Sequence, residues 1–179
     1  MAGILERSQE LRIEGLETPR LFYLVLKEPA PLAGMSYPAM RMPWRRLYDL
    51  GFHHVVCLCC ERVDYNPAPL RMLCKVEMED LHHGNEPLYP AMNERLVRDA
   101  VSAINACMDK GEGVAVHCVG GTGRTGTVIG CVLRSRGYSA DEVIAYLDYV
   151  NKQRGRRGWP EAPWQTEMVR HFDTVPNRQ

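Results

Sequence analysis

The sequence predicts an α/β domain whose central sheet is mostly parallel and is flanked by helices. Short apolar segments rich in valine alternate along the chain with longer segments whose apolar residues recur at helical spacing. The 179 residues match the size of one ordinary domain. Because no internal repeat or low-complexity linker divides them, we expect residues 1–179 to form a single domain, with residues 1–20 as a loosely ordered lead.

The N-terminal part of this pattern contains one strand and one short helix. The apolar residues 21–27 predict the strand, whereas the proline and glycine residues in 28–43 favour loops and turns alone. Pro43 fits the first position of a short helix, and Gly51 fits its end.

Two strands and a long helix are predicted in the middle of the chain. Residues 53–59 are short, apolar and partly β-branched, which is typical of a strand buried on both faces, and residues 70–78 form a less regular strand. After a polar loop, the apolar residues from about Ala91 to Lys110 repeat at helical spacing, and Gly111 ends this helix.

The C-terminal part contains one more strand and three helices. Residues 114–118 predict the strand, and a glycine-rich turn leads from it into a helix that ends at Gly137. Ser139 and Glu142 form a capping box for the next helix, and Pro163 lies near the start of the last one.

Composition and charge indicate a globular protein with no general attraction to polyanions. Hydrophobic residues make up 45% and charged residues 25% of the chain, and 22 basic residues balance 22 acidic ones. A net charge of zero gives no global field toward nucleic acid or an anionic membrane, so any anion site must be local. The chain also lacks a long apolar run and the apolar core of a signal peptide. We expect a cytoplasmic protein with no nucleic-acid partner and no membrane insertion.

The seven cysteines have irregular spacings, which indicates reduced thiols rather than a disulfide framework. Cys57, Cys59 and Cys60 lie close together on a predicted strand, but no second Cys-x-x-Cys or His-x-x-x-His pair completes four zinc ligands. The sequence therefore predicts no metal site.

The glycine-rich turn after residues 114–118 carries the strongest functional pattern. Backbone N–H groups in such a turn form a nest for an anion, and the N-terminus of the following helix adds about half a positive charge. A phosphoryl group fits this environment. The same field stabilises a thiolate, so we expect Cys118 to be a nucleophile at neutral pH. The planar guanidinium of Arg124 is suited to bind two phosphate oxygens at the mouth of the turn.

The residues His117-Cys118-x-x-Gly121-x-x-Arg124-Thr125 resemble the HCxxGxxR[ST] signature of the cysteine-dependent protein tyrosine and dual-specificity phosphatases. The resemblance implies that Cys118 attacks phosphorus to form a phosphocysteine and that the Thr125 hydroxyl helps the thiolate to leave. It implies that His117 orients the loop and tunes the thiolate. The implied phosphate-binding residues are Val119, Gly120, Gly121, Thr122, Gly123 and Arg124.

The same resemblance implies a general acid, and it requires no metal or organic cofactor. In this family the acid is an aspartate on a loop upstream of the cysteine. Asp80 starts a segment that resembles the family's Asp-x-Gly-x-Pro loop with extra residues inserted, and Glu86 and Glu79 are the alternatives. No cofactor is expected, because the thiolate, Arg124 and the loop amides supply the nucleophile and the charge stabilisation.

Two further residues take part in the resemblance. Gln165 is similar to the glutamine that positions the hydrolytic water in tyrosine phosphatases, although an ordinary polar residue on a helix is the alternative. Cys59 lies in a Leu-Cys-x-Glu-Arg stretch that resembles the phosphatase and tensin homologue, in which this cysteine forms a reversible disulfide with the catalytic one. The alternative for Cys59 is a buried apolar thiol.

Other interpretations of the turn explain fewer of its residues. Gly121, Gly123 and Gly126 match a dinucleotide-binding fingerprint, but that motif leaves Cys118 and Arg124 without a role. A Walker A loop requires lysine where Arg124 stands. A sulfur-transfer loop places a cysteine at a strand end but does not account for the Arg-Thr-Gly continuation.

The expected reaction is hydrolysis of phosphotyrosine in proteins, with phosphoserine and phosphothreonine as further substrates. The loop has no basic residue between Cys118 and Arg124, which disfavours a polyphosphorylated inositol. A non-protein phosphomonoester, such as an inositol phosphate or a phospholipid, is the first alternative, and a catalytically silent phosphate-binding module is the second. The basic residues at 152–157 are interpreted as a solvated helix end. The sequence predicts no oligomeric state.

Overall fold

The computed structural model describes residues 12–172, so most of the expected lead lies outside the described residues. Residues 12–20 form turns, and the side chain of Ile13 is buried in the core beneath the sheet. Within residues 12–172, no helix is long and apolar enough to cross a bilayer.

A five-stranded sheet forms the centre of the fold, in the order β1-β2-β5-β3-β4. The first pair, β1 with β2, is antiparallel, and the other three pairs are parallel. This arrangement confirms the mostly parallel sheet. The strands are β1 (Phe22–Leu26), β2 (Leu32–Met35), β3 (Phe52–Cys57), β4 (Arg71–Lys75) and β5 (Gly113–His117).

The strand β2 corrects the expectation that residues 28–43 hold only loops and turns. Its four residues are fully buried and pair with β1 on one side and with β5 on the other. Gly34 lies beneath the ring of Tyr23, where any side chain would collide with that ring. Pairing on both sides satisfies the backbone hydrogen bonds of this short segment. The surrounding prolines favour turns, so the local sequence does not predict a strand here.

The helices lie where the periodicity predicts them. Ser139 caps one of them by accepting a hydrogen bond from the Glu142 N–H at 3.3 Å, as expected. The helix after the glycine-rich turn begins at Gly123, earlier than its apolar spacing predicts. Its first turn therefore includes part of the glycine-rich turn. The helices are α2 (Trp44–Asp49), α3 (Pro90–Met108), α4 (Gly123–Ser135), α5 (Ala140–Gln153) and α6 (Pro163–Arg170).

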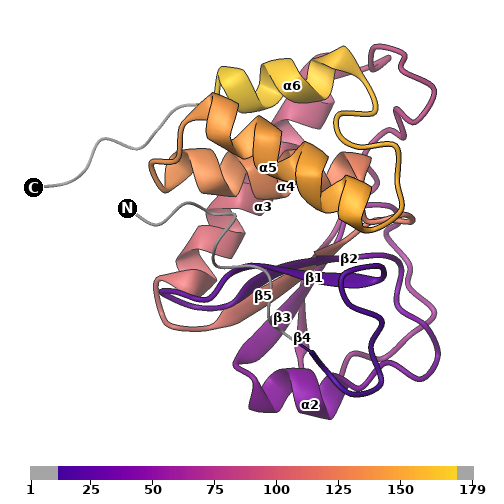
Figure 1. Ribbon diagram of the computed structural model, residues 1–179, viewed down its shortest axis with the longest axis vertical. Helices are drawn as coiled ribbons and strands as arrows, with labels where there is room; N and C mark the ends of the chain where they lie inside the picture. Colours follow the sequence, from indigo (N-terminus) through magenta and orange to yellow (C-terminus); the bar gives the residue numbers. More distant parts are fainter. Residues whose placement is uncertain (1–11, 173–179) are drawn as a thin grey trace, which may run out of the picture.

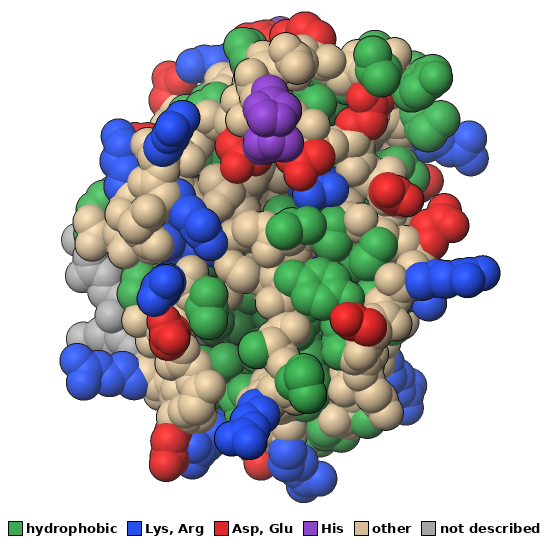
Figure 2. All heavy atoms as spheres, turned by 90° about the vertical axis from the view of Figure 1, so that its right-hand side faces the viewer, with side chains coloured by type: hydrophobic (Ala, Val, Ile, Leu, Met, Phe, Trp, Pro, Cys, Tyr) green, Lys and Arg blue, Asp and Glu red, His purple; other side chains and the backbone are tan. Residues whose placement is uncertain are grey.

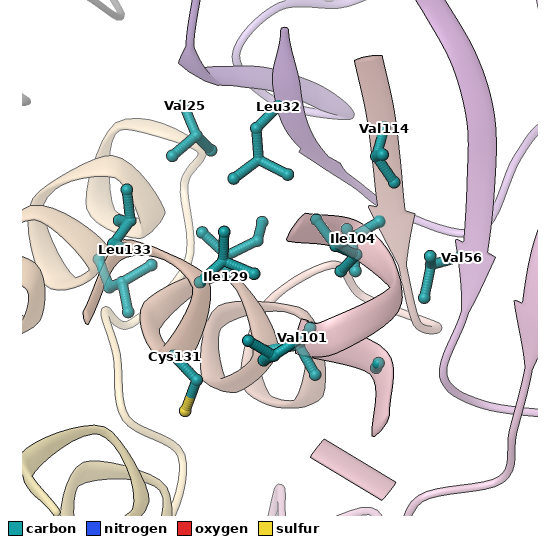
Figure 3. Close-up of a cluster of buried hydrophobic side chains, with 14 of the residues drawn as sticks. Val25, Leu32, Val56, Val101, Ile104, Val114, Ile129, Cys131 and Leu133 are labelled. Atoms are coloured by element: carbon teal, nitrogen blue, oxygen red, sulfur yellow. The ribbon is translucent and has the colours of Figure 1, made fainter. Parts of the chain in front are cut away.

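The sheet separates two hydrophobic cores. Helices α3, α4 and α5 lie on one side of the sheet with α6 packed against α4 and α5, and α2 lies on the other side (Figure 1). In the larger core, Val56 and Val114 face Ile104 of α3, and Ile129 of α4 fills the space beside them (Figure 3). Burial of each such side chain contributes about 1.5–3 kcal/mol. Because β2, β5 and β3 run parallel, their carboxyl ends lie at the same edge of the sheet, and the loop after β5 begins there.

Candidate active site

The glycine-rich loop begins at the carboxyl end of the central strand β5. Cys118 directly follows this strand and is 3% exposed, and the loop continues into α4, whose first residue is Gly123. The flanking strands β2 and β3 hold β5 on both sides, so the base of the loop is fixed by the sheet.

The loop carbonyls are bound to the protein behind the loop. Val119 O accepts a hydrogen bond from the Tyr37 N–H at 2.9 Å, Gly120 O from Ser36 Oγ at 3.0 Å, and Gly121 O from Tyr23 OH at 3.1 Å. In a trans peptide the N–H points opposite to the C=O. The N–H groups that follow these three carbonyls therefore face the open side of the loop, as in an anion nest.

Arg154 binds the carbonyl side of the loop. This corrects the expectation that residues 152–157 are a solvated helix end, because Arg154 is buried. Its side chain lies at the end of α5, is 3% exposed and stacks over the ring of Tyr23 with 4.6 Å to the centroid. Nη1 donates to Gly121 O at 2.7 Å and Nη2 to Gly120 O at 2.9 Å. Its other hydrogen-bond acceptors are Arg20 O, Ser36 Oγ, Thr122 Oγ1 and Asn151 Oδ1.

Glycine is required at one position of this loop for two reasons. Gly121 has a φ of +70°, a conformation that other residues rarely adopt. A Cβ there would lie 2.5 Å from Met35 O and 2.8 Å from the Arg154 guanidinium. The glycine thus permits the close approach of β2 and Arg154 that holds the loop carbonyls in place.

The structure brings Asp80 to Arg124. Asp80 Oδ2 lies 2.9 Å from Arg124 Nη2, and Met78 O accepts from Arg124 Nη1 at 3.2 Å. Of the two alternative acids, Glu79 accepts hydrogen bonds from the N–H groups of Leu88 and Tyr89 at the start of α3. Glu86 is exposed. Of the three candidate acids, Asp80 is therefore the one that lies beside Arg124.

His117, the residue before Cys118, and Thr125, the residue after Arg124, are both fully buried. The His117 ring bonds Tyr65 OH through Nε2 at 2.5 Å and Cys118 O through Nδ1 at 3.1 Å, which fixes its orientation. Among residues 12–172, Thr125 Oγ1 has no hydrogen-bond partner. Its hydroxyl is thus free to donate a hydrogen bond.

Gln165 lies on the first turn of α6 and is 1% exposed. It accepts a hydrogen bond from Glu161, a residue near the loop that the sequence analysis missed. Its Oε1 accepts from the Glu161 N–H at 2.8 Å, and its amide lies near Gly123. The Glu161 carboxylate lies against the first turn of α4, where any side chain at position 123 would collide with it. Burial raises the pKa of the Glu161 carboxyl, and the nearby Asp80 raises it further. An isolated glutamate in a Pro-rich segment offers no local pattern that reveals this position.

A pocket of about 500 Å³ adjoins the glycine-rich loop. Gly120 and Thr122 of the loop form one wall, and the segment between α5 and α6 forms the other with Arg156, Arg157 and Trp159. Figure 2 shows the end of the molecule on the right of Figure 1, where basic, acidic and histidine side chains surround a hydrophobic region. A ligand bound by the loop therefore has room to extend toward guanidinium groups.

Cys59 lies in a cluster of thiols at the end of β3. Its sulfur is 3.9 Å from that of Cys57, which is 3.5 Å from that of Cys60. Within the described chain all the cysteines are free thiols. The implied disulfide between Cys59 and Cys118 stays a prediction.

Comparison with known proteins agrees with this arrangement. The PTP-SAK family model, described as "Swiss Army Knife protein, DSP-PTPase phosphatase domain", matches residues 19–155. The tyrosine-protein phosphatase CDC14 of Candida albicans (strain SC5314 / ATCC MYA-2876) is 35% identical over 78 residues, which are 43% of this chain and 14% of that protein. The chain thus spans a small part of the length of this relative.

Solved structures establish the likeness of the fold. The active form of Tk-PTP has a TM-score of 0.56 and 23% identity, and the match covers 79% of this chain and 90% of that one. PTPMT1 in complex with PI(5)P has a TM-score of 0.55 and 17% identity, with coverage of 79% and 88%. Together with the match over residues 19–155, the sheet and the loop after β5 show that the chain belongs to the dual-specificity and protein tyrosine phosphatase family, in the PTP-SAK group.

Proposed function

We propose that this protein is a cysteine-dependent phosphomonoesterase that hydrolyses phosphotyrosine in proteins, and also phosphoserine and phosphothreonine, through a phosphocysteine intermediate. One observation carries the proposal: Cys118 lies at the base of a loop whose three bound carbonyls turn N–H groups toward an anion, with Arg124 and Asp80 2.9 Å apart beside it. This set supplies a nucleophile, charge stabilisation and an acid within one site.

The reaction has two steps. The Cys118 thiolate attacks phosphorus while Arg124 and the N–H groups of residues 120–122 hold the phosphoryl oxygens, and Asp80 donates its proton to the departing oxygen. A water molecule, oriented by Gln165, then attacks the phosphocysteine as Asp80 takes up a proton. Inorganic phosphate and the thiolate are released, and the Thr125 hydroxyl stabilises the thiolate by a hydrogen bond. The support for Thr125 is its unpartnered Oγ1 within residues 12–172.

A non-protein phosphomonoester is the second candidate substrate, and one observation favours it. Arg156 and Arg157 line the pocket beside the loop and supply the positive charge that the loop itself lacks. A substrate with a second anionic group, such as an inositol phosphate or a phospholipid, gains from these guanidinium groups.

The test is phosphate release from a panel of substrates, with Cys118→Ser as the blank. The panel contains phosphotyrosyl and phosphoseryl peptides, inositol phosphates, a phosphoinositide and a small aryl phosphate. Turnover by the wild type alone supports the proposal, and the ranking of kcat/KM within the panel identifies the substrate class. If neither the wild type nor the blank releases phosphate, the protein is a phosphate-binding module.

Asp80→Asn is expected to lower kcat by about 10²–10³-fold for substrates with poor leaving groups. An activated aryl phosphate needs little proton donation to its leaving oxygen, so the variant is expected to hydrolyse it nearly as fast as the wild type does. The measurement is kcat for an alkyl and an activated aryl phosphate. Glu86→Gln is the matched control, and a loss with the alkyl phosphate that is confined to Glu86→Gln assigns the acid to Glu86.

Glu161→Gln is expected to tighten inhibition by inorganic phosphate about 3–10-fold near neutral pH, because the charged carboxylate repels an anion in the loop. The pKa of Glu161 is raised, so the wild-type carboxyl becomes neutral as pH falls through this pKa, and the difference between the two proteins is expected to disappear there. The measurement is the inhibition constant of phosphate against pH. Glu167→Gln removes the same charge from an exposed position on α6 and serves as the control. Equal inhibition of wild type and Glu161→Gln at every pH contradicts the prediction.

A further inference from the structure

We propose that Cys57, Cys59 and Cys60, together with His117, form a binding site for a thiophilic divalent cation of the zinc class. This thiol site lies at the carboxyl ends of β3 and β5. Three thiols and an imidazole are a donor set that zinc commonly adopts in proteins.

The register of the sheet creates the site. Cys57 is the last residue of β3 and pairs directly with His117, the last residue of β5. Successive residues of an extended segment alternate between faces, so Cys59, two positions further on, returns to the side of Cys57. The chain then turns, and Cys60 approaches Cys57 so closely that the Cys57 thiol donates to Cys60 O at 3.4 Å.

The distances match those of metal ligands. A tetrahedral ion with bonds of about 2.3 Å to sulfur separates its sulfur ligands by about 3.8 Å. Cys57 Sγ lies 3.9 Å from Cys59 Sγ and 3.5 Å from Cys60 Sγ. A His117 ring nitrogen and the sulfurs of Cys57 and Cys59 all lie within 4.8 Å of one another. Cys60, whose sulfur lies beside that of Cys57, is the candidate for the fourth position.

The surroundings provide shielding and orientation. The rings of Tyr37 and Tyr65 pack edge-on against His117 at 5.3 and 5.5 Å, and Trp44 stacks on Tyr65. An apolar shell and an oriented histidine both strengthen metal sites. Three thiolates, a neutral imidazole and a divalent cation carry one net negative charge, and Arg124 lies close enough to Cys59 to interact favourably with a negative charge there.

Metal binding releases protons from the thiols and breaks one hydrogen bond of His117. Each thiol that becomes a ligand releases its proton to the solvent, so affinity rises with pH. Because Nε2 of His117 bonds Tyr65 OH and Nδ1 bonds Cys118 O, the imidazole gives up one of these contacts when it binds the ion. Since this change disturbs the residue before Cys118, the ion is expected to inhibit turnover; this expectation alone rests on the proposed phosphatase function.

One other group of donors within residues 12–172 must be separated from this site. His54, Cys107 and Glu112 also lie within 4.8 Å of one another. There the imidazole and the carboxylate already pair with each other at 2.8 Å, and only one sulfur is present. A soft cation therefore favours the thiol site.

The test measures metal binding directly, without activity as the readout. The full chain, reduced with a phosphine and freed of metal, is titrated with Zn²⁺ against a chromophoric chelator and separately with Co²⁺. We expect a single equivalent of tight binding, and a Co²⁺ spectrum with intense visible bands of tetrahedral geometry and a thiolate charge-transfer band. Weak or absent binding, or a Co²⁺ spectrum without thiolate bands, overturns the proposal. Loss of two titratable thiols without metal uptake identifies a disulfide and also overturns it.

Matched variants locate the ion. Cys57→Ser and Cys59→Ser are expected to weaken Zn²⁺ binding at least about 100-fold, whereas Cys107→Ser and Cys118→Ser are expected to retain it. Loss in Cys118→Ser places the ion in the phosphate-binding loop, and loss in Cys107→Ser places it at His54 and Glu112; either result contradicts the proposal. Circular dichroism confirms folding of each variant, and the Co²⁺ spectrum of the wild type keeps the proposal testable if one variant does not fold. If the wild type binds the ion as expected but shows no turnover with or without it, the proposed function fails and the metal site stands.

Discussion

Cys118→Ser is expected to lower kcat/KM by at least about 10⁴-fold while phosphate binding is retained. Serine keeps the shape of the residue but replaces a thiolate with a neutral hydroxyl that is a far weaker nucleophile. The cradle itself is formed by backbone groups whose carbonyls are bound to Tyr23, Ser36 and Tyr37, and none of these contacts involves the sulfur. The measurement combines turnover of an aryl phosphate with calorimetric binding of inorganic phosphate.

The control for this variant is Cys131→Ser, which makes the same atomic change at a fully buried thiol in α4. It is expected to keep turnover within a few-fold of the wild type and to cost about 1–3 kcal/mol of stability, because it buries a hydroxyl in an apolar core. Turnover by Cys118→Ser comparable to that of Cys131→Ser contradicts the assignment of the nucleophile.

Arg154→Met is expected to lower the free energy of unfolding by about 3–5 kcal/mol and kcat/KM by about 10²-fold. Methionine fills the apolar part of the space, but it removes the charged donor from the carbonyls of Gly120 and Gly121, which then keep only Ser36 Oγ and Tyr23 OH, respectively. The loop therefore loses its charge-assisted contacts, and its N–H groups are held less firmly toward the substrate. The measurements are urea denaturation and kcat/KM for a small aryl phosphate.

Arg170→Met is the matched control for this prediction. Arg170 is exposed at the end of α6 and makes an ion pair with Asp141 at 3.0 Å. Surface pairs of this kind contribute little, so we expect a change within about 0.5 kcal/mol and unaltered turnover. If Arg154→Met behaves like Arg170→Met, the loop is held without its arginine support.

The parts of the fold and site that the sequence predicts are those with dense local patterns. Residues 117–125 combine a strand end, glycines and an arginine within nine positions, so the loop after β5 is predicted before any tertiary contact is known. The long helix α3 is predicted by its apolar spacing in the same way. The family is predicted by the same loop, and the match over residues 19–155 confirms it.

The parts that the sequence does not predict depend on contacts between distant segments. The strand β2 is stabilised by pairing with β1 and β5 rather than by its own propensity, and Gly34 and nearby prolines conceal it. Arg154 stands in a run of basic residues that resembles a solvated helix end, yet its partners Gly120 and Gly121 lie more than thirty positions earlier in the chain. Glu161 is likewise placed by the packing of its segment against α4.

The contacts behind the glycine-rich loop affect when this loop forms as the chain folds. Tyr23 and Gly121 are 98 positions apart, and Tyr146 donates to Leu24 O across 122 positions. Closing such distant segments costs chain entropy before any contact repays it, and folds rich in such contacts form slowly. During synthesis the first two strands leave the ribosome long before β5, the strand that β2 must pair with, and before Arg154. The anion nest is therefore one of the last features to form, and a partly synthesised or partly folded chain has no means of binding phosphate in this loop.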